Sequence, residues 1–394
     1  MSAGARVAEL ADQIRGVTYS KEDAASTPRP GYLPVLRAGN IADDGLVFDD
    51  LVYVPAERIA ATQKVRRNDV VIAASSGSLD VVGKAARALA DFEGGFGAFC
   101  KVLRPGPAVD PAYFAHFFRT REYRRRVSAL AAGANINNLR NEHLDEFQIP
   151  LPPLPEQRRI AEILDKADAL RAKRRAALAQ LDTLTQSIFL DMFGDPATNP
   201  KRWPKASFEE LFEIARGGSP RPIDDYITDD PDGINWIMIG DTVEGGKYIT
   251  STRKRIRPEG ARRSRAVNPG DFLLTNSMSF GRPYIMRTSG CIHDGWLVLS
   301  PRREDVEPNY FYALLGTQAV YAEFARRAPG ATVKNLNIDL VRGVTVPVPP
   351  LPTQQKFAAV VASIEGRAST YNRALAECDA LFTVLQHHAF RGEL

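Results

Sequence analysis

Cysteine and histidine are scarce in this sequence, and neither residue type stands at the spacings that metal sites use. The three cysteines, Cys100, Cys291 and Cys378, lie far apart and are odd in number, which favours reduced thiols over a disulfide framework or a zinc site. The five histidines show no metal-ligand spacing either, since the one adjacent pair is His387 and His388 near the last residue. We therefore expect neither disulfide bonds nor a bound metal.

Long apolar runs are also missing. No stretch approaches the roughly 20 consecutive apolar residues of a membrane span, and the first residues, MSAGARVAELADQ, lack the apolar core of a signal peptide. Hydrophobic residues make up 44% and charged residues 25% of the 394 residues, which is typical of a globular protein with two or more domains. We expect a cytoplasmic protein that has no membrane partner.

The sequence signatures of common enzymes are absent as well. There is no Gly-x-Ser-x-Gly elbow, no dinucleotide-binding fingerprint and no Asn-Pro-Pro-aromatic tetrad of the adenine methyltransferases. Residues 77–84 resemble a phosphate-binding loop, but they contain one intervening residue too many, and Ala85 stands where Ser or Thr should bind magnesium. We therefore predict a non-catalytic protein, while paired carboxylates of an enzyme leave no signature in a single sequence.

The dominant feature is an internal repeat at half the length of the chain. The segment GANINNLRNEHLDEFQIPLPPLPEQRRIA, which begins at Gly133, recurs without a gap 197 residues later as GATVKNLNIDLVRGVTVPVPPLPTQQKFAA. The same register continues as far as Phe193 and Phe390. A single repeat of this length indicates a duplicated domain with approximate two-fold symmetry, and it is too long for a solenoid unit.

The parts of the chain that precede the matched segments are less alike. VLRAGNI resembles IMIGDTV, and NDVVIAASSGS resembles GDFLLTNSMSFG, but these pairs no longer share the offset of 197 residues. Short apolar runs separated by turn-rich pieces indicate strands. We predict a mixed α+β fold with two globular α/β domains, at residues 1–150 and 196–347, which share a scaffold and differ in their recognition surfaces.

A long helix is predicted after each proline run. Pro155 and Pro352 suit the first position of a helix, where no amide hydrogen is needed. We predict helices over residues 151–195 and 348–394 that pair antiparallel as a coiled-coil spacer between the two globular domains. The alternative is that each is an ordinary core helix. The positions predicted to pair the helices are Ile163, Ala167, Leu170, Leu181, Leu184, Ile188, Val360, Ile364, Cys378, Leu381 and Leu385.

Basic residues occur at comparable places in both halves, just before a predicted strand, and a short polar loop follows each strand. Lysine and arginine neutralise phosphates, and small polar side chains can read base edges. The alternative is an ordinary solvated loop in each half, and the arginines of residues 119–126 form a further basic face. The candidate DNA-binding residues are Lys64, Arg66, Arg67, Ser75, Ser76, Ser78 and Lys84 in the first half, and Arg253, Lys254, Arg255, Arg257, Arg262, Arg263, Arg265, Asn276, Ser277, Ser279 and Arg282 in the second half.

These motifs resemble those of a known family over essentially the full length of the chain. IPLPPLPEQRRIAEILDKAD and VPVPPLPTQQKFAAVVASIE, the preceding GANINNL and GATVKNL, and the segments GDFLLTNS and LDMFGDP are similar to the conserved regions of Type I restriction–modification specificity subunits. The family pattern is not kept everywhere: Asn68 stands where the second half has Gly270, and Thr353 replaces the acid of Glu156.

The resemblance implies a DNA-binding protein with two target-recognition domains. Each would read one half of a split double-stranded target through the major groove, while the two helices set the gap and dock two methyltransferase subunits. A third, motor-nuclease subunit would join in assemblies that cut DNA. S-adenosylmethionine would bind to the partner methyltransferase, so no cofactor is expected on this chain.

Three other functions stay open at this point. The chain could serve an orphan methyltransferase or another defence system, it could be a fragment of an enzyme that acts on DNA, or it could be a coiled-coil scaffold unrelated to DNA. The missing catalytic signatures argue against the enzyme, and the matched basic stretches argue against the scaffold.

Overall fold

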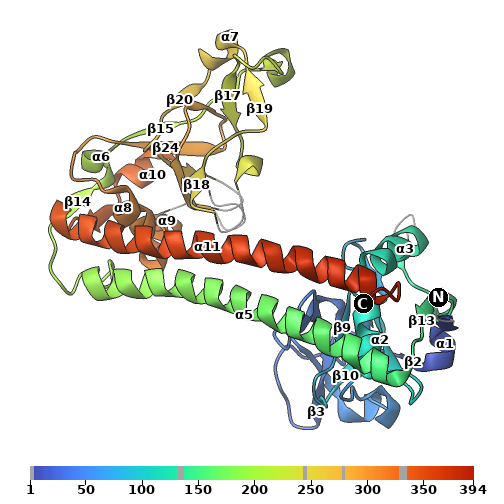
Figure 1. Ribbon diagram of the computed structural model, residues 1–394. Coiled ribbons are helices and arrows are strands. Elements are labelled where there is room, and N and C mark those ends of the chain that lie inside the picture. Colours follow the sequence, from blue (N-terminus) through green and yellow to red (C-terminus); the bar gives the residue numbers. More distant parts are fainter. Residues whose placement is uncertain (1–3, 132–136, 243–245, 277–279, 328–334) are drawn as a thin grey trace. The chain divides into compact units, whose positions relative to one another are not determined.

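The computed structural model of the chain describes residues 4–131, 137–242, 246–276, 280–327 and 335–394. These residues divide into two compact units (Figure 1). Unit 1 comprises residues 1–177 and 371–394, and unit 2 comprises residues 178–370. Each unit contains one globular domain and a stretch of each of the two long helices.

The globular domain of unit 1 is built from small sheets that are antiparallel except where β10 pairs with β3 in parallel. Its strands are β1 (Gly4–Arg6), β2 (Ala11–Arg15), β3 (Tyr32–Leu36), β4 (Ile41–Ala42), β5 (Gly45–Leu46), β6 (Val52–Pro55), β7 (Val70–Ala73), β8 (Ser75–Ser76), β9 (Ala85–Arg87), β10 (Gly95–Phe96), β11 (Cys100–Pro105), β12 (Asn137–Asn138) and β13 (Gln148–Pro150). The main sheet has the order β2-β11-β7-β9, and a second sheet has the order β10-β3-β6. All four residues of β7 are buried, as a short apolar run between polar residues predicts.

Helices cover the main sheet of unit 1. They are α1 (Val7–Leu10), α2 (Pro111–Phe117), α3 (Arg121–Ala131) and α4 (Asn141–Asp145). The start of α2 is fixed because the carboxylate of Asp110 accepts the amides of Ala112 and Tyr113, both at 3.0 Å. Aromatic rings fill the space between these helices, where Phe118 and Tyr123 meet edge to face with 5.2 Å between their centroids.

Unit 2 repeats this plan with two larger sheets. Its strands are β14 (Lys205–Ser207), β15 (Phe212–Arg216), β16 (Ile227–Thr228), β17 (Ile234–Ile237), β18 (Tyr248–Ile249), β19 (Lys254–Ile256), β20 (Arg265–Val267), β21 (Phe272–Thr275), β22 (Pro283–Met286), β23 (Gly290–Ile292), β24 (Trp296–Pro301) and β25 (Thr345–Pro347). Its short helices are α6 (Phe208–Leu211), α7 (Pro258–Ala261), α8 (Pro308–Leu315), α9 (Gln318–Arg327) and α10 (Ile338–Arg342). The main sheet, β15-β24-β21-β22-β18, matches that of unit 1 and carries one further strand, and the second sheet has the order β16-β19-β17-β23-β20.

The central strands β7 and β21 begin in the same way in both units. The residue two positions before the strand has a left-handed backbone, with φ of +74° at Asn68 and +96° at Gly270. The acid that follows it, Asp69 in unit 1 and Asp271 in unit 2, accepts the backbone amide three residues earlier at 2.8 and 2.7 Å. Asparagine tolerates this conformation better than other residues with a Cβ, so the exchange of glycine for asparagine preserves the turn.

The two long helices are α5 (Leu154–Phe193) and α11 (Leu351–Ala389). In unit 1 they run antiparallel, since Arg171 of α5 binds Asp379 of α11 while Arg159, earlier in α5, donates to the carbonyl of Leu394. In unit 2 the last turns of α5 meet the first turns of α11, where Phe193 packs against Phe357 with 5.4 Å between ring centroids. The predicted mixed fold with two α/β domains and paired long helices is confirmed.

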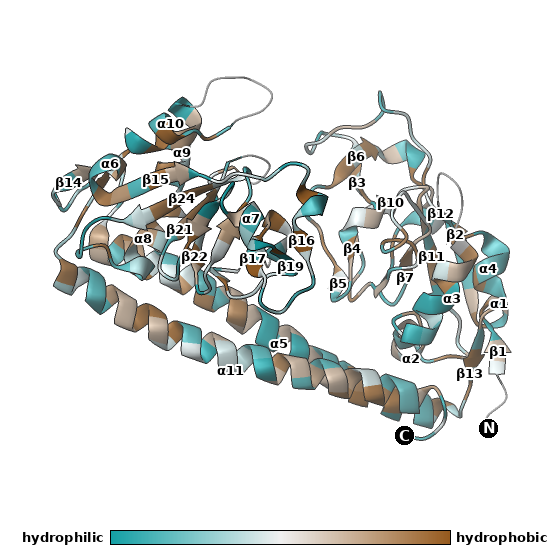
Figure 2. Ribbon diagram, turned by 90° about the horizontal axis from the view of Figure 1, so that it is seen from above, coloured by the Kyte–Doolittle hydropathy of each residue, from teal (hydrophilic) through white to brown (hydrophobic). Residues whose placement is uncertain are grey.

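The prediction of which side chains pair the helices is wrong at four positions. Leu170, Leu184, Val360 and Leu381 are 44%, 44%, 38% and 54% exposed, and the helices carry hydrophobic and hydrophilic residues along their whole length (Figure 2). The side chains that join the cores of the globular domains are Ile160, Ala161, Leu164, Phe382 and Ala389 in unit 1, and Phe189, Phe193, Phe357 and Val361 in unit 2. Three/four spacing fits several faces of a helix with dispersed apolar residues, so spacing alone does not select the buried face. Of the other predicted positions, Ile364 is buried, and Ile163, Ala167, Leu181, Ile188, Cys378 and Leu385 are partly buried.

A buried glutamine ties each proline run to its own globular domain. Gln157 accepts the amide of Asp110 at 2.8 Å and donates to the carbonyl of Pro152 at 2.8 Å. Gln354, 197 residues later, accepts the amide of Glu307 at 3.1 Å. The two glutamines are 1% and 0% exposed, so the repeated Pro-Leu-Pro-x-Gln motif is a structural joint in both units.

The described residues contain neither a membrane helix nor a cluster of metal ligands. None of their helices is both long enough and apolar enough to cross a membrane. In the same residues, no three His, Cys, Asp or Glu side chains come together in a group that could hold a metal ion.

Candidate nucleic-acid interface

Three basic residues precede β7 in unit 1. Arg66 and Arg67 are exposed and form no ion pair within the described part of the chain, whereas Lys64 lies 3.5 Å from Glu93. The loop that carries them is fixed, since its backbone is bound to the buried carboxylate of Asp69. Two of the three cations are therefore free to meet an external phosphate.

The polar loop after β7 lies at the other end of the same strand. Ser75 and Ser76 form β8, which pairs with β12, and Ser78 is exposed in the turn that follows. Lys84 is engaged with Asp43 at 3.4 Å. The basic residues and the serines of this half therefore lie at opposite ends of β7, as their order in the sequence predicts.

The basic cluster of unit 2 lies on its second sheet and around α7. Lys254, Arg257, Arg262 and Arg265 are exposed, and none of the four forms an ion pair with another described residue. Lys254 lies on β19 and Arg265 on β20, which are separated by β17 and β23, whereas Arg257 and Arg262 flank α7. Cations that lack an internal partner are suited to a polyanion. This is the densest group of candidate residues that the structure brings together.

Three other arginines of the cluster have partners inside the domain. Arg253 is 78% exposed and lies 4.0 Å from Asp241. Arg255 donates to two backbone carbonyl groups, and the guanidinium of Arg263 lies 5.8 Å from the ring centre of Tyr226. These contacts orient the loop and leave fewer of its cations for DNA than the sequence suggests.

The predicted polar loop of unit 2 is only partly accessible. Asn276 is 3% exposed and its amide donates to the carbonyl of Asp294 at 2.8 Å, so its assignment as a base-reading residue is corrected to a structural one. Arg282 is half-buried, 5.6 Å from the ring centre of Tyr284. Ser277 and Ser279 lie outside the described residues.

The arginines of residues 119–126 divide between internal contacts and solvent, since Arg119 and Arg124 are half-buried and the other three are exposed. Arg124 donates to two backbone carbonyls of the preceding loop, at 2.5 and 2.8 Å, and Arg126 lies 4.8 Å from the ring centre of Phe147. Arg121 and Arg125 are exposed. Composition suggests a basic face here, and the structure keeps Arg121, Arg125 and Arg126 exposed on it while Arg119 and Arg124 bind groups of the domain.

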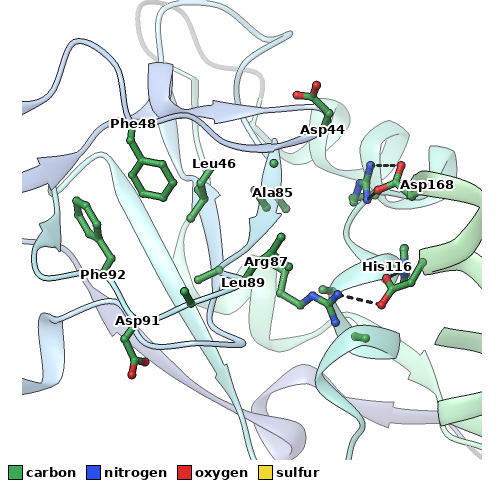
Figure 3. Close-up of a pocket in the computed structure, with 18 residues that line it drawn as sticks. Asp44, Leu46, Phe48, Ala85, Arg87, Leu89, Asp91, Phe92, His116 and Asp168 are labelled. Carbon is green, nitrogen blue, oxygen red and sulfur yellow. Dashed lines mark hydrogen bonds and ion pairs between the residues drawn. The ribbon is translucent and has the colours of Figure 1, made fainter. Parts of the chain in front are cut away.

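The sequence does not reveal the ionic joint that Asp168 forms in unit 1. Both carboxylate oxygens of Asp168 accept hydrogen bonds from Arg119, at 2.6 and 3.0 Å (Figure 3). Arg171, on the same helix, binds Asp168 at 2.8 Å and Asp379 of α11 at 2.5 Å. Burial raises the pKa of the Asp168 carboxyl, but the hydrogen bond and charge of Arg119 outweigh burial and hold that pKa below its usual value.

A second ionic joint stands at the equivalent place in unit 2. Glu365, 197 residues after Asp168, lies 2.6 Å from the ammonium of Lys247 and 3.3 Å from the hydroxyl of Tyr248. Lys247 is 13% exposed and also donates to Asn309 at 2.5 Å. Only the internal repeat could have pointed to this pair of acids, because neither stands in a recognisable motif.

A cleft of about 300 Å³ lies beside the joint of unit 1. Leu46, Phe48 and Leu89 line one side of it, and His116 lies on the other side (Figure 3). The Nε2 atom of His116 is 2.8 Å from Asp165, and its Nδ1 atom has no partner in the described part of the chain. Burial lowers the pKa of His116, which favours the neutral ring.

Two segments of the chain match one protein family. Residues 5–180 and 200–374 match the family described as Type I restriction modification DNA specificity domain. The two segments fall in the two halves of the internal repeat, so each globular domain matches the family separately.

Individual relatives agree with this match. The chain is 31% identical over 418 residues to the Type I restriction enzyme EcoKI specificity subunit of Escherichia coli strain K12, with 99% of this chain and 88% of that protein covered. It is 45% identical over 186 residues to the Type I restriction enzyme StySPI specificity subunit of Salmonella potsdam, with 47% of this chain and 40% of that protein covered.

Two solved structures share the fold over 99% of this chain. One, from work on complex assembly and conformational transition of the type I R-M system, has a TM-score of 0.57 at 20% identity, with 98% of that chain covered. The other, the S subunit of a Type-I restriction-modification system from M. genitalium, has a TM-score of 0.55 at 16% identity, with 96% of that chain covered.

Proposed function

The chain belongs to the family of Type I restriction–modification DNA specificity subunits, and from this premise we propose that it reads a bipartite DNA sequence on behalf of an adenine methyltransferase. The globular domain of unit 1 is target-recognition domain 1, and that of unit 2 is target-recognition domain 2. Each reads one half of the target, and the chain itself carries out no chemistry.

The observation that supports this proposal most strongly is the group of unpaired cations on target-recognition domain 2. Arg257 and Arg262 flank α7, Lys254 and Arg265 lie on β19 and β20 of the second sheet, and none of the four has an ion-pair partner among the described residues. Arg66 and Arg67 provide a smaller basic surface on target-recognition domain 1. Contacts of this kind position a protein on the phosphate backbone, while different neighbouring side chains select different bases.

Exposed leucines on the long helices support docking of two copies of one partner. Leu184 in unit 2 and Leu381 in unit 1 stand 197 residues apart and are 44% and 54% exposed. Equivalent apolar positions on a duplicated scaffold offer two like sites to identical subunits. We assign these sites to the methyltransferase, which would bind S-adenosylmethionine and extrude the target adenine, and a motor-nuclease subunit would join where DNA is cut.

A methylation map of genomic DNA tests the proposed function. Cells that express this chain with its adjacent methyltransferase are compared with cells that lack this chain. We expect a bipartite, adenine-methylated motif that disappears when the chain is absent. A methyltransferase that forms a complex with the chain yet methylates no defined motif would contradict the assignment and favour a scaffold.

The same cells distinguish a restriction system from an orphan methyltransferase. Unmethylated plasmid DNA that carries the mapped motif is introduced into them, and its survival is compared with that of a plasmid without the motif. Loss of the first plasmid alone indicates a nuclease partner. Equal survival indicates a specificity subunit that serves methylation only.

A further inference from the structure

We propose that Asp168 and Glu365 are matched positioning residues, each of which fixes the orientation of its own target-recognition domain on the long helices and thereby the spacing at which the two half-targets are read. The inference rests on the proposed function. The two acids occupy equivalent positions in the repeat, one on α5 and one on α11, and each binds a cation of its own globular domain.

The two joints use different cations at the same place. In unit 1 the cation is Arg119, which follows α2, and in unit 2 it is Lys247, which precedes β18. The residue equivalent to Arg119 in unit 2 is Gly316, which lies 197 residues later. The residue equivalent to Lys247 in unit 1 is Leu46, because each of the two follows a glycine in the matching segment. The acid has therefore been retained through divergence of the domains, while its partner has changed.

Both joints reach the same loop of the recognition domain. This loop follows β3 in unit 1 and β17 in unit 2, and in each unit it begins where Asn40 or Asp241 accepts a backbone amide, at 2.8 and 2.9 Å. Arg119 donates to the carbonyl of Asp43 in this loop at 2.9 Å, whereas Lys247 belongs to the loop itself. Each acid thus links its helix to the loop that extends from the central sheets of its domain.

The joint of unit 1 is more extensive than that of unit 2. Arg171 connects Asp168 to Asp379 on the second helix, and its guanidinium lies 4.3 Å from the ring centre of Phe382. The residue of unit 2 that is equivalent to Arg171 is Ala368. Loss of Asp168 would leave two arginines facing each other, so its replacement should disturb orientation more than replacement of Glu365 does.

The contact of unit 1 suits positioning because it is directional and partly buried, whereas in unit 2 Lys247 is 13% and Glu365 is 40% exposed. Paired hydrogen bonds between a guanidinium and a carboxylate define an angle as well as a distance. The side chains of Arg119 and Asp168 are 19% and 22% exposed, so water competes with them less than at an open surface. An ionic joint of this kind holds a rigid domain at one angle to its helix. That angle sets the distance along the DNA between the two half-targets that the domains read.

The test uses the complete complex with the methyltransferase and the target defined by the methylation map. Initial methylation rates are measured on duplexes that carry the two half-targets at the natural spacing and at one base pair more or less. The readout is the ratio of the methylation rate at altered spacing to the rate at natural spacing. We expect Asp168→Asn to raise this ratio by about tenfold and Glu365→Gln to raise it severalfold. Asp168→Glu should keep the natural preference, because unit 2 uses glutamate at this position.

Matched controls and a second variant make the result decisive. Glu162→Gln on α5 and Glu377→Gln on α11 remove exposed acids of the same helices and should not change the spacing preference. Arg119→Gln breaks the joint of unit 1 from the domain side and should act like Asp168→Asn even if that variant fails to fold. An equal fall in rate at every spacing, or an unchanged ratio in all variants, would overturn the proposal. If the unaltered chain directs methylation to no motif, the proposed function itself fails before spacing is compared.

Discussion

At the residue scale, a buried glutamine at the start of each long helix binds backbone groups of its unit, two at Gln157 and three at Gln354. We expect Gln157→Leu and Gln354→Leu each to lower the free energy of unfolding by about 2–4 kcal/mol, because an amide and a carbonyl lose their partners while buried. All three tryptophans lie in residues 178–370, so tryptophan fluorescence reports the unfolding of unit 2. In urea titrations, the lower unfolding midpoint of Gln354→Leu should therefore appear in the fluorescence. That of Gln157→Leu should appear in the circular dichroism. Gln180→Leu, at an exposed position of α5, is the control, and a shift as large as in the other two would refute the explanation.

His116 makes the stability of unit 1 depend on pH. Burial lowers its pKa below the ordinary value of 6.5, so the unfolded chain takes up a proton before the folded chain does. The stabilisation is complete above pH 6.5 and is lost as the pH falls toward the folded pKa. The groups that face the ring are Asp165, Asp168 and Arg119.

We expect the urea midpoint of the unaltered chain to fall between about pH 7 and pH 5, and to fall less in His116→Phe. Circular dichroism at several pH values measures this. His293 lies in unit 2, and burial lowers its pKa as well. His293→Phe should change the urea midpoint measured by fluorescence. It should leave unchanged the pH dependence of the circular-dichroism midpoint that is due to His116. Parallel curves for His116→Phe and the unaltered chain would show that the ring does not titrate as argued.

At the scale of single elements, β19, α7 and β20 present the cations that should bind phosphates. Arg262→Ala and Arg265→Ala are each expected to weaken DNA binding by a similar factor for all sequences and to reduce the slope of log affinity against log salt by about 1. Fluorescence anisotropy of labelled duplexes over a range of sodium chloride concentrations measures both effects. Arg326→Ala is the matched control, because Arg326 is already paired with Glu323 at 2.8 Å. If the slope is unchanged in both variants, this sheet does not face the DNA backbone.

The long helices carry the proposed docking sites. Leu184→Asp and Leu381→Asp should each weaken binding of one methyltransferase copy by at least about tenfold. In either variant a carboxylate replaces the apolar surface that the partner would cover. Native mass spectrometry should show one bound copy for either single variant and none for the double variant. Gln186→Asp places the same charge on an exposed polar position of α5 on the face opposite Leu184 and should retain two copies. Two copies bound to the double variant would rule out this face.

At the scale of the whole molecule, duplication is what made the fold predictable. A repeat with a fixed offset identifies two domains and two helices without knowledge of any contact, and the starts of β7 and β21 show the same turn despite the exchange of Asn68 and Gly270. The site was less predictable. Asn276 has the chemistry of a base reader, but its burial depends on Asp294, which is distant in sequence. The same holds for Asp168 and Glu365, because each acquires its role from a cation on another element.

The unequal divergence of the two halves leads to a prediction about the whole chain. The matched segments keep the scaffold, whereas the segments that differ carry Arg66 and Arg67 in one half and the denser basic group in the other. Replacement of residues 1–150 by the corresponding part of a relative should therefore change one half of the methylated motif and leave the other half intact, since target-recognition domain 2 and its joint to α11 stay unaltered. Methylation maps of the hybrid and the parent measure this. The parent gene with only silent exchanges in that region controls for expression. A change in both halves of the motif would show that the two domains do not read independently.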